Sequence, residues 1–156
     1  MPSRREDIAM TPEERRAYLE ANRKVILTSI GPTGYPHPMP MNYLFRDDTF
    51  LITTFRKSQK VKNLERDPRA ALLVEAGNKY DEYKSVLAYA DAEIIDELAF
   101  THDVMRAMGE QDAKGDAQRL AEVRAIADAS APKRIILRFR PQEYVSWDHA
   151  KLGGRY

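Results

Sequence analysis

Runs of β-branched and aromatic residues, separated by turn signals, recur between residues 25 and 147. Such runs predict strands when Gly, Pro, Asn or Asp residues bound them. Five segments have this pattern: VILTSI (Val25–Ile30), TFLITTF (Thr49–Phe55), AALLVE (70–75), SVLAYADAEII (Ser85–Ile95) and RIILRFRPQEYVSW (134–147). Most of the connections are short, so the pattern favours antiparallel pairing.

Two short helices are predicted outside these strands. In TPEERRAYLEANR, Thr11 is a suitable N-cap and Glu14 completes a capping box. In QKVKNLER, Ser58 is a plausible N-cap and Pro68 ends the helix.

A helical insertion is predicted from about 97 to 129, as two helices broken near 109–115. The second helix has an apolar stripe made of Leu120, Val123, Ile126 and Ala127. Strands joined by tight turns, with helices between some of them, indicate a mainly β (α+β) protein. We expect a small antiparallel barrel with helices packed on its outside.

The segment HPMPMNYLF (37–45) and the proline before it have an unusual alternation. Three prolines share one parity: Pro36, Pro38 and Pro40. The opposite parity carries Met39, Met41 and Tyr43. Because alternate N–H groups of a strand point to the same neighbour, one edge of this strand lacks donors. We therefore expect it at a sheet edge, or beside a ligand or a partner.

Composition narrows the class of protein. The 156 residues suit one domain, 1–156, and the 43% apolar and 31% charged shares are ordinary for a globular protein. The 25 basic and 24 acidic residues leave a net charge of +1, which argues against nucleic-acid binding. The chain has no cysteine, so it has no disulfide or thiol nucleophile. No apolar run would span a bilayer, and we expect a cytoplasmic protein.

A concentration of cations follows the strand Thr49–Phe55, in FRKSQKVKNLERDPRA (Phe55–Ala70). Charged two-turn helices are common at protein surfaces, and by itself this segment favours a solvated helix. The alternative is an anion, such as a phosphate, held at the start of that helix. The donors would be Thr53, Thr54, Lys57, Ser58, Gln59 and Lys60.

Other chemistry-bearing residues give weaker signals. The three histidines have no metal-ligand spacing, and Asp148-His149 beside Ser146 lacks a nucleophile-elbow context. Met105 and Met108 have the spacing of helix packing. Trp147, the only tryptophan, is either a core residue or a flat wall for an aromatic ligand.

Two motifs in their order along the chain, KSQK-x-x-NL-x-R-DPR and SWDH-x-KLG, resemble the pyridoxamine 5′-phosphate oxidase-like split β-barrels, most of all their F-420-dependent branch. The resemblance covers nearly the whole chain. It implies a homodimer with the cofactor at the interface. The cofactor phosphate would be held by Thr53, Thr54, Lys57, Ser58, Gln59 and Lys60. The ring would lie near Pro40, Met41, Asn42 and Tyr43, with Trp147 approaching from the partner subunit.

The tail departs from true pyridoxamine phosphate oxidases, because DHAKLGGRY replaces their arginine–histidine substrate motif. The resemblance therefore implies hydride transfer between F-420 and a small organic substrate, and not vitamin B6 oxidation. The proton would come from solvent or from a donor such as Tyr43. An FMN-dependent oxidoreductase is the nearest alternative, and a non-catalytic flavin- or deazaflavin-binding protein is the second. Nucleic-acid and membrane partners are not expected.

Overall fold

The computed structural model describes residues 4–154, in which eight antiparallel strands form one sheet. The sheet order is β2-β1-β5-β6-β7-β4-β3, and β8 also pairs with β6. The strands are β1 (Lys24–Ile30), β2 (Pro36–Asn42), β3 (Leu44–Arg46), β4 (Thr49–Phe55), β5 (Arg69–Ala76), β6 (Lys84–Ile95), β7 (Arg134–Phe139) and β8 (Glu143–Asp148). The helices are α1 (Arg4–Ile8), α2 (Pro12–Ala21), α3 (Gln59–Arg66), α4 (Leu98–Ala113) and α5 (Ala117–Ser130), with 3₁₀ turns η1 (Tyr80–Glu82), η2 (Ala131–Lys133) and η3 (His149–Leu152).

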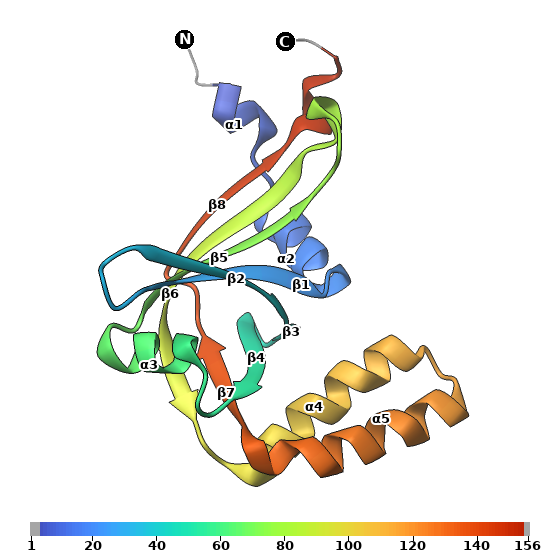
Figure 1. Cartoon of the computed structure of the whole chain (residues 1–156). Helices are drawn as coiled ribbons and strands as arrows, with labels where there is room; N and C mark the ends of the chain where they lie inside the picture. The colour runs from blue at the N-terminus through green and yellow to red at the C-terminus, as the bar shows by residue number, and fades with distance from the viewer. Residues whose placement is uncertain (1–3, 155–156) are drawn as a thin grey trace.

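The long strand β6 makes the sheet curl. Along one edge it pairs with β5, from Lys84 to Asp91. Along the other edge, its first half pairs with β8 and its second half, Ala92–Ile95, pairs with β7. The first half of β6 therefore lies between β5 and β8, and its second half continues into the part of the sheet that contains β7. The sheet as a whole wraps into a half-barrel (Figure 1). The expected split-barrel class, mainly β with peripheral helices, is confirmed.

One apolar cluster fills the inside of the curled sheet. Alternate residues of the strands point into it, among them Val86, Ala88 and Ala90 of β6. Leu19 from α2 and Leu64 from α3 complete the cluster. These helices therefore cover the barrel with their apolar sides, while their charged sides face solvent.

β2 is an edge strand, as its prolines predict. It pairs with β1 over its whole length, from Pro36 opposite Ile30 to Asn42 opposite Lys24. Because this ladder is continuous, the proline nitrogens occupy the positions that point away from β1. The outer edge of β2 has no strand partner within the described chain.

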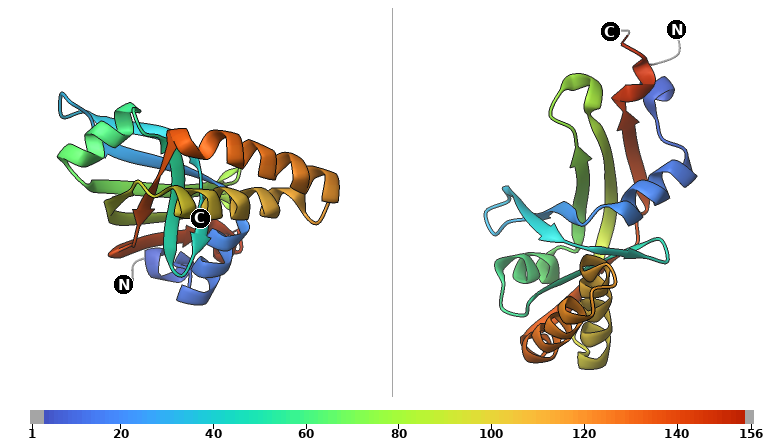
Figure 2. Two further views of the ribbon diagram at one scale, coloured as in Figure 1. Left: turned by 90° about the horizontal axis from the view of Figure 1, so that it is seen from below. Right: turned by 90° about the vertical axis from the view of Figure 1, so that its right-hand side faces the viewer.

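The helical insertion forms a hairpin that projects from the barrel (Figure 2). The break lies at 114–116, where Lys114 has a left-handed backbone. Gly109 is inside α4, where a side chain would overlap with Val123 of α5. The predicted stripe of α5 is only partly right. Ala127 is buried, but Ile126 is 61% exposed because the hairpin has no further layer over that face.

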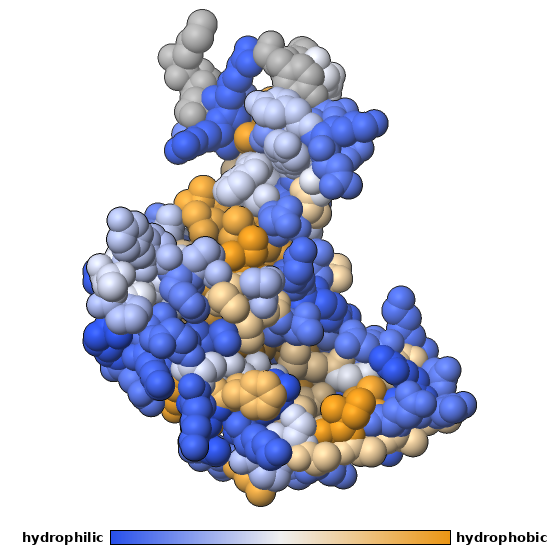
Figure 3. All heavy atoms as spheres, in the orientation of Figure 1, coloured by the Kyte–Doolittle hydropathy of each residue, from blue (hydrophilic) through white to orange (hydrophobic). Residues whose placement is uncertain are grey.

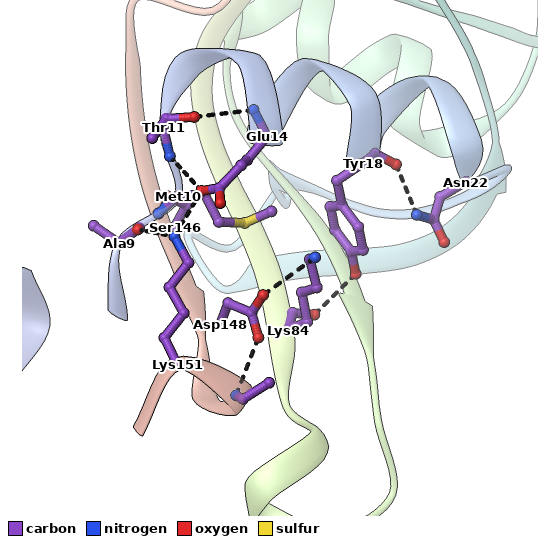
Figure 4. A network of polar contacts seen from close by, with 11 residues as sticks. Ala9, Met10, Thr11, Glu14, Tyr18, Asn22, Lys84, Ser146, Asp148 and Lys151 are labelled. Carbon is purple, nitrogen blue, oxygen red and sulfur yellow. Dashed lines mark hydrogen bonds and ion pairs between the residues drawn. The ribbon is translucent and has the colours of Figure 1, made fainter. Parts of the chain in front are cut away.

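The N-terminal segment 9–14 and the C-terminal segment 146–151 meet beside β6. The capping box of α2 is present, with Thr11 Oγ1 accepting from Glu14 N at 3.2 Å and Glu14 Oε2 accepting from Thr11 N at 2.8 Å. Lys151 Nζ also donates to Glu14 Oε2 at 2.6 Å (Figure 4). This hydrogen bond is the main reason why the pKa of Glu14 lies below its usual value.

A second set of contacts ties α2 to the sheet. The Tyr18 hydroxyl donates to the Lys84 carbonyl at 2.8 Å, and burial raises the pKa of Tyr18 to about 12. Lys84 Nζ lies 3.2 Å from Asp148, and Met10 N donates to Ser146 Oγ at 3.1 Å. The SWDH-x-KLG motif therefore holds the N-terminal segment against the sheet. Within residues 4–154, no helix has the length and apolar character needed to cross a membrane.

Candidate cofactor site

The corner between β4 and α3 presents several hydrogen-bond donors at one point. Ser58 occupies the N-cap position of α3, but its hydroxyl does not cap the helix. Instead it shares a hydrogen bond with the hydroxyl of Thr54, at 3.3 Å. The first N–H groups of α3 therefore have no side-chain cap, which leaves the positive end of the helix available to an anion.

Lys60 reaches back across this corner. Its Nζ donates to Thr54 Oγ1 at 3.3 Å, and the side chain is half-buried. Burial, followed by the nearby charge of Arg134, holds the pKa of Lys60 below its ordinary value. Lys60 is therefore not a freely exposed cation, because the strand-to-helix corner folds its stem against the protein.

Arg134, at the start of β7, brings a second cation to the corner. Its Nε donates to Ser130 Oγ at 2.7 Å, and its guanidinium lies 4.2 Å from the Phe55 ring centroid. Within residues 4–154 neither Arg134 nor Lys60 has an ion-pair partner. Arg56, by contrast, makes two bonds to Asp96, at 2.8 and 2.5 Å. Helix N–H groups, hydroxyls and two cations without a carboxylate fit a phosphate group.

Gln59 is turned away from this convergence. Its Nε2 donates to Asn63 Oδ1 at 2.9 Å, so only its backbone N–H faces the helix start. Asn63 is buried and donates to Ser29 Oγ, while Arg66 donates to the Ile30 carbonyl at 2.6 Å. The second half of the KSQK-x-x-NL-x-R motif therefore holds α3 against β1.

A cleft of about 330 Å³, here called the basic cleft, adjoins the β4–α3 corner. Its lining consists of Phe55, Arg56, Lys57, Pro132 and Lys133. Lys57 and Lys133 have no ion-pair partner among the described residues. This cleft therefore extends the positive charge beyond the phosphate-sized corner.

A cleft of about 380 Å³ lies between β2 and α4. It is lined by Pro40, Met41, Asn42, Thr53, Met105, Met108, Asp112 and Arg134. Three residues of β2 that were predicted to lie beside the cofactor ring thus share a cleft with Thr53, which was predicted to hold the cofactor phosphate. Sequence reasoning missed the contributions of α4 and Arg134. The i, i+3, i+7 spacing of Met105, Met108 and Asp112 was the available signal.

Tyr43 does not line this cleft. Its ring is fully buried and packs against Phe50, with ring centroids 5.1 Å apart. Its hydroxyl donates to the Leu19 carbonyl at 2.7 Å, and burial raises its pKa far above the ordinary value. The suggestion that the Tyr43 side chain faces the ring or donates a proton is therefore wrong, because the parity of the strand turns it into the core.

Trp147 lies elsewhere on the same chain. It belongs to β8, opposite Ser85, and lines a separate cavity of about 550 Å³. The other walls of that cavity include Ile8, Met10 and Arg15 from the N-terminal segment. One chain alone therefore does not bring Trp147 to the β4–α3 corner.

An apolar row crosses the face of the sheet that points away from the core. Directly paired residues Ile26, Leu73, Leu87 and Val145 form it, with Pro40 at the β2 end. Val145 is 38% exposed, and apolar atoms are visible over this part of the sheet (Figure 3). Trp147 is two residues from Val145 on the same strand, so strand alternation puts it on this face. The row therefore connects the strand of the ring residues with the strand of Trp147.

A metal centre has no support in the part of the chain that the structure describes. Residues 4–154 contain no group of three or more His, Cys, Asp or Glu side chains placed to hold a metal ion.

Solved structures with this fold have differing described roles. Conserved hypothetical protein Rv2991 from Mycobacterium tuberculosis is 34% identical, with 96% of this chain and 92% of that chain covered and a TM-score of 0.86. An F420 reductase is 19% identical, with coverages of 86% and 98% and a TM-score of 0.61. The heme storage protein HutZ from Vibrio cholerae is 15% identical, with coverages of 86% and 94% and a TM-score of 0.65. The last two show a shared fold alone.

The sequence itself matches a known protein family. No curated protein matches the chain. The family model described as pyridoxamine 5′-phosphate oxidase matches residues 11–148, which include the β4–α3 corner, the cleft beside β2 and Trp147. This match spans most of the sequence and agrees with the curled antiparallel sheet. The chain belongs to the pyridoxamine 5′-phosphate oxidase family of split-barrel proteins.

Proposed function

We propose that this protein is an F-420-dependent oxidoreductase that reduces a small organic substrate. The observation that carries the proposal is the β4–α3 corner, where an uncapped helix start meets Lys60 and Arg134. Neither cation has an acidic partner within residues 4–154. Two unpaired cations close enough to interact raise the free energy of the empty site, and a bound phosphate would relieve it.

Several residues would hold the cofactor. The phosphate-binding set is Thr53, Thr54, Lys57, Ser58, Lys60 and Arg134, with Gln59 acting through its backbone N–H. The ring would lie along Pro40, Met41 and Asn42. When bound, the deazaflavin supplies the hydride, and the protein supplies orientation and a dry cleft. Since Tyr43 is buried, we propose that the substrate proton comes from solvent.

The basic cleft of about 330 Å³ beside the corner favours F-420 over FMN. FMN ends at its phosphate, whereas F-420 continues into a lactyl-glutamate tail that carries carboxylates. Lys57 and Lys133 line a cleft next to the corner, and both lack an acidic partner in the described residues. Such a surface suits a tail of negative charge. FMN remains the alternative cofactor, because the corner itself suits any phosphate.

We further propose that the functional unit is a cytoplasmic homodimer. The apolar row Ile26–Leu73–Leu87–Val145 offers a face that a second copy would bury. Trp147 and Pro40 belong to that face, so a face-to-face pair would bring the Trp147 of one subunit toward the ring cleft of the other. This arrangement accounts for the separation of Trp147 from the corner within one chain.

The test is a titration of the apo-protein with F-420 and with FMN, followed by fluorescence quenching. Tighter F-420 binding is expected, together with turnover on a panel of electron acceptors. The variant Lys133→Ala is expected to weaken F-420 binding and to leave FMN binding unchanged, because Lys133 lines only the cleft beyond the phosphate corner. Lys62→Ala, an exposed cation on α3, is the matched control.

Each other outcome has a definite meaning. Tighter FMN binding would replace the cofactor assignment by the flavin alternative. Tight F-420 binding without turnover on any acceptor would favour a storage protein. Binding of neither cofactor would overturn the proposal and leave the basic corner as a solvated helix.

A further inference from the structure

A cavity of about 550 Å³ lies between β8 and residues 5–15. It shares no lining residue with the cleft beside β2 or with the basic cleft. Its apolar walls include Ile8, Met10, Val145 and Trp147, and all of its walls come from one chain. A space of this size with mostly apolar walls is typical of a small-molecule site.

Three hydrogen bonds hold the N-terminal wall of this cavity in place. Met10 N donates to Ser146 Oγ at 3.1 Å, and Lys151 Nζ donates to the Ala9 carbonyl at 2.8 Å and to Glu14 Oε2 at 2.6 Å (Figure 4). Met10 is also part of the main apolar cluster. The fold therefore builds this wall before any ligand arrives.

Arg15 supplies a cation at the wall of the cavity. Its guanidinium carbon lies 4.1 Å from the centroid of the Tyr144 ring. Stacking uses the flat face of the guanidinium and leaves its N–H groups, which lie in the plane, available to a carboxylate. Arg15 has no acidic partner within residues 4–154. Arg5 and Glu6, which also line the cavity, are opposite in charge, so Arg15 leaves a positive excess.

His149 supplies a hydrogen-bond acceptor to the same cavity. Its Nδ1 lies 2.6 Å from the Tyr80 carbonyl oxygen. Because a carbonyl only accepts, Nδ1 carries the proton and the neutral ring keeps Nε2 as an acceptor. The rings of Tyr80 and Tyr83 pack against the imidazole, with centroids 4.6 and 5.7 Å away, and fix its orientation. The cavity thus combines a cation, an acceptor and the flat wall of Trp147.

We propose that this cavity binds a small aromatic carboxylate that also carries a hydroxyl group. Arg15 would bind the carboxylate, the indole of Trp147 would contact the aromatic ring, and His149 Nε2 would accept from the hydroxyl. A sugar or a phosphate ester would need more polar partners than these walls supply, because each buried polar group left unpaired costs free energy. The site is distinct from the proposed cofactor site and does not depend on it.

The test uses 4-hydroxyphenylacetate as the probe, with two reporters inside the cavity. Trp147 is the only tryptophan, so its fluorescence reports on this cavity. The chain has six methionines, and [¹³C-methyl]methionine labelling gives signals that single Met→Leu variants would assign. The probe is expected to change the Trp147 emission and to shift the Met10 signal. The signal of Met105, in the cleft beside β2, should stay in place. Saturating F-420 should change the Kd of the probe, measured by NMR, less than twofold.

The neutral analogue 4-hydroxyphenylacetamide tests the role of the charge. It is expected to bind at least tenfold more weakly than the probe, a comparison that needs no variant. Arg15→Gln should weaken binding of the probe at least tenfold and remove its advantage over the amide. Arg16→Gln, which removes the neighbouring cation that pairs with Asp48, is the matched control and should change the Kd less than twofold.

Phenylacetate, which lacks the hydroxyl, tests the role of His149. It should bind more weakly than 4-hydroxyphenylacetate to the wild type. His149→Phe keeps a ring at this position but has no Nε2, so the two ligands should bind it equally. The Kd of phenylacetate itself should stay within twofold in this variant, which shows that the cavity is intact.

Several results would overturn the proposal. They are no binding up to the solubility limit of the probe, a shift of Met105 in place of Met10, equal Kd values for the acid and the amide, equal effects of Arg15→Gln and Arg16→Gln, and displacement of the probe by F-420. Failure of the proposed function would look different. In that case F-420 would not bind, while the probe would still shift the Met10 signal.

Discussion

The side-chain amide of Asn63 donates a hydrogen bond to the hydroxyl of Ser29 over 3.1 Å, and the two side chains are 0% and 1% exposed. Asn63 Oδ1 in turn accepts from Gln59 at 2.9 Å. This buried contact joins the middle of α3 to β1 and fixes the direction in which the helix leaves β4. The position of the phosphate-sized corner therefore depends on a residue that does not line it.

Replacing Asn63 by Ala should destabilise the protein by about 1–3 kcal/mol, because the Ser29 hydroxyl would be left buried without its donor. Chemical denaturation with urea measures the change. Lys62→Ala, on the exposed side of the same helix, should alter the free energy of unfolding by less than about 0.5 kcal/mol. Equal denaturation midpoints for the wild type and the Asn63 variant would contradict a structural role for this hydrogen bond.

Lys60→Ala should weaken cofactor binding by about 1.5–3 kcal/mol, roughly 10- to 150-fold in Kd, the usual contribution of a charge-assisted hydrogen bond. Fluorescence titration with F-420 measures it, and thermal unfolding of the apo-protein should barely change. If both this variant and Arg134→Ala bind F-420 normally, the corner does not hold the cofactor phosphate and α3 is only a solvated surface helix.

Cofactor affinity should fall with rising pH in the alkaline range. Burial and the Arg134 charge hold the pKa of Lys60 low in the apo-protein, and a bound phosphate would raise that pKa again. Affinity is therefore complete below the lowered pKa and declines as the pH rises toward the pKa of the bound state. Over the interval between the lowered pKa and the ordinary value, the stability of the apo-protein should rise with pH, because the unfolded chain binds more protons there.

The measurement is the Kd of F-420 between neutral and alkaline pH, for the wild type and for Lys60→Ala. The variant should show a shallower decline, because it lacks the titrating ammonium. An identical slope in both proteins would assign the pH dependence to another group.

Gly109→Ala should destabilise the helical hairpin by about 1–3 kcal/mol, the usual cost of overpacking, because the new methyl group would overlap with Val123. The paired variant Gly109→Ala/Val123→Ala should recover much of this loss. A double-mutant cycle on the free energy of unfolding measures the coupling between the two positions. Strictly additive effects would show that α4 and α5 do not pack through this pair.

Leu87→Glu should dissociate the proposed homodimer, because it puts a charge in the middle of the apolar row. Light scattering after size exclusion should show the mass falling from two chains to one at micromolar concentration, with F-420 binding lost as well. Tyr35→Glu, in the β1–β2 turn where the side chain is 79% exposed, is the control and should leave the mass unchanged. A dimeric Leu87→Glu variant would locate the interface elsewhere.

Locally determined features could be predicted from the sequence. The strand Thr49–Phe55 and the Thr11–Glu14 capping box are both present as predicted, since pattern and capping residues act over a few positions. The edge position of β2 also followed from local chemistry, because a proline without an N–H cannot pair on that side.

Features that depend on long-range packing could not be predicted. RIILRFRPQEYVSW is two strands, β7 and β8, and only the folded sheet shows that both pair with β6. The contribution of Arg134 and Met108 to the cleft arises because the helical insertion returns to the barrel beside β4. Tyr43 was assigned to the wrong side because the parity of a segment does not show which face is the core.

The three prolines of β2 also limit how copies of this protein can associate. Without N–H groups on its outer edge, β2 offers an incoming strand few donors, so chains cannot easily add to one another as in an amyloid-like polymer. At the other end of the sheet, β3 has only three residues, and the N-terminal segment bonds to β8 through Met10 and Ser146. Growth by strand addition is therefore disfavoured at β2 and at β3, so copies of the chain associate more readily through the faces of the sheet than through these two edges.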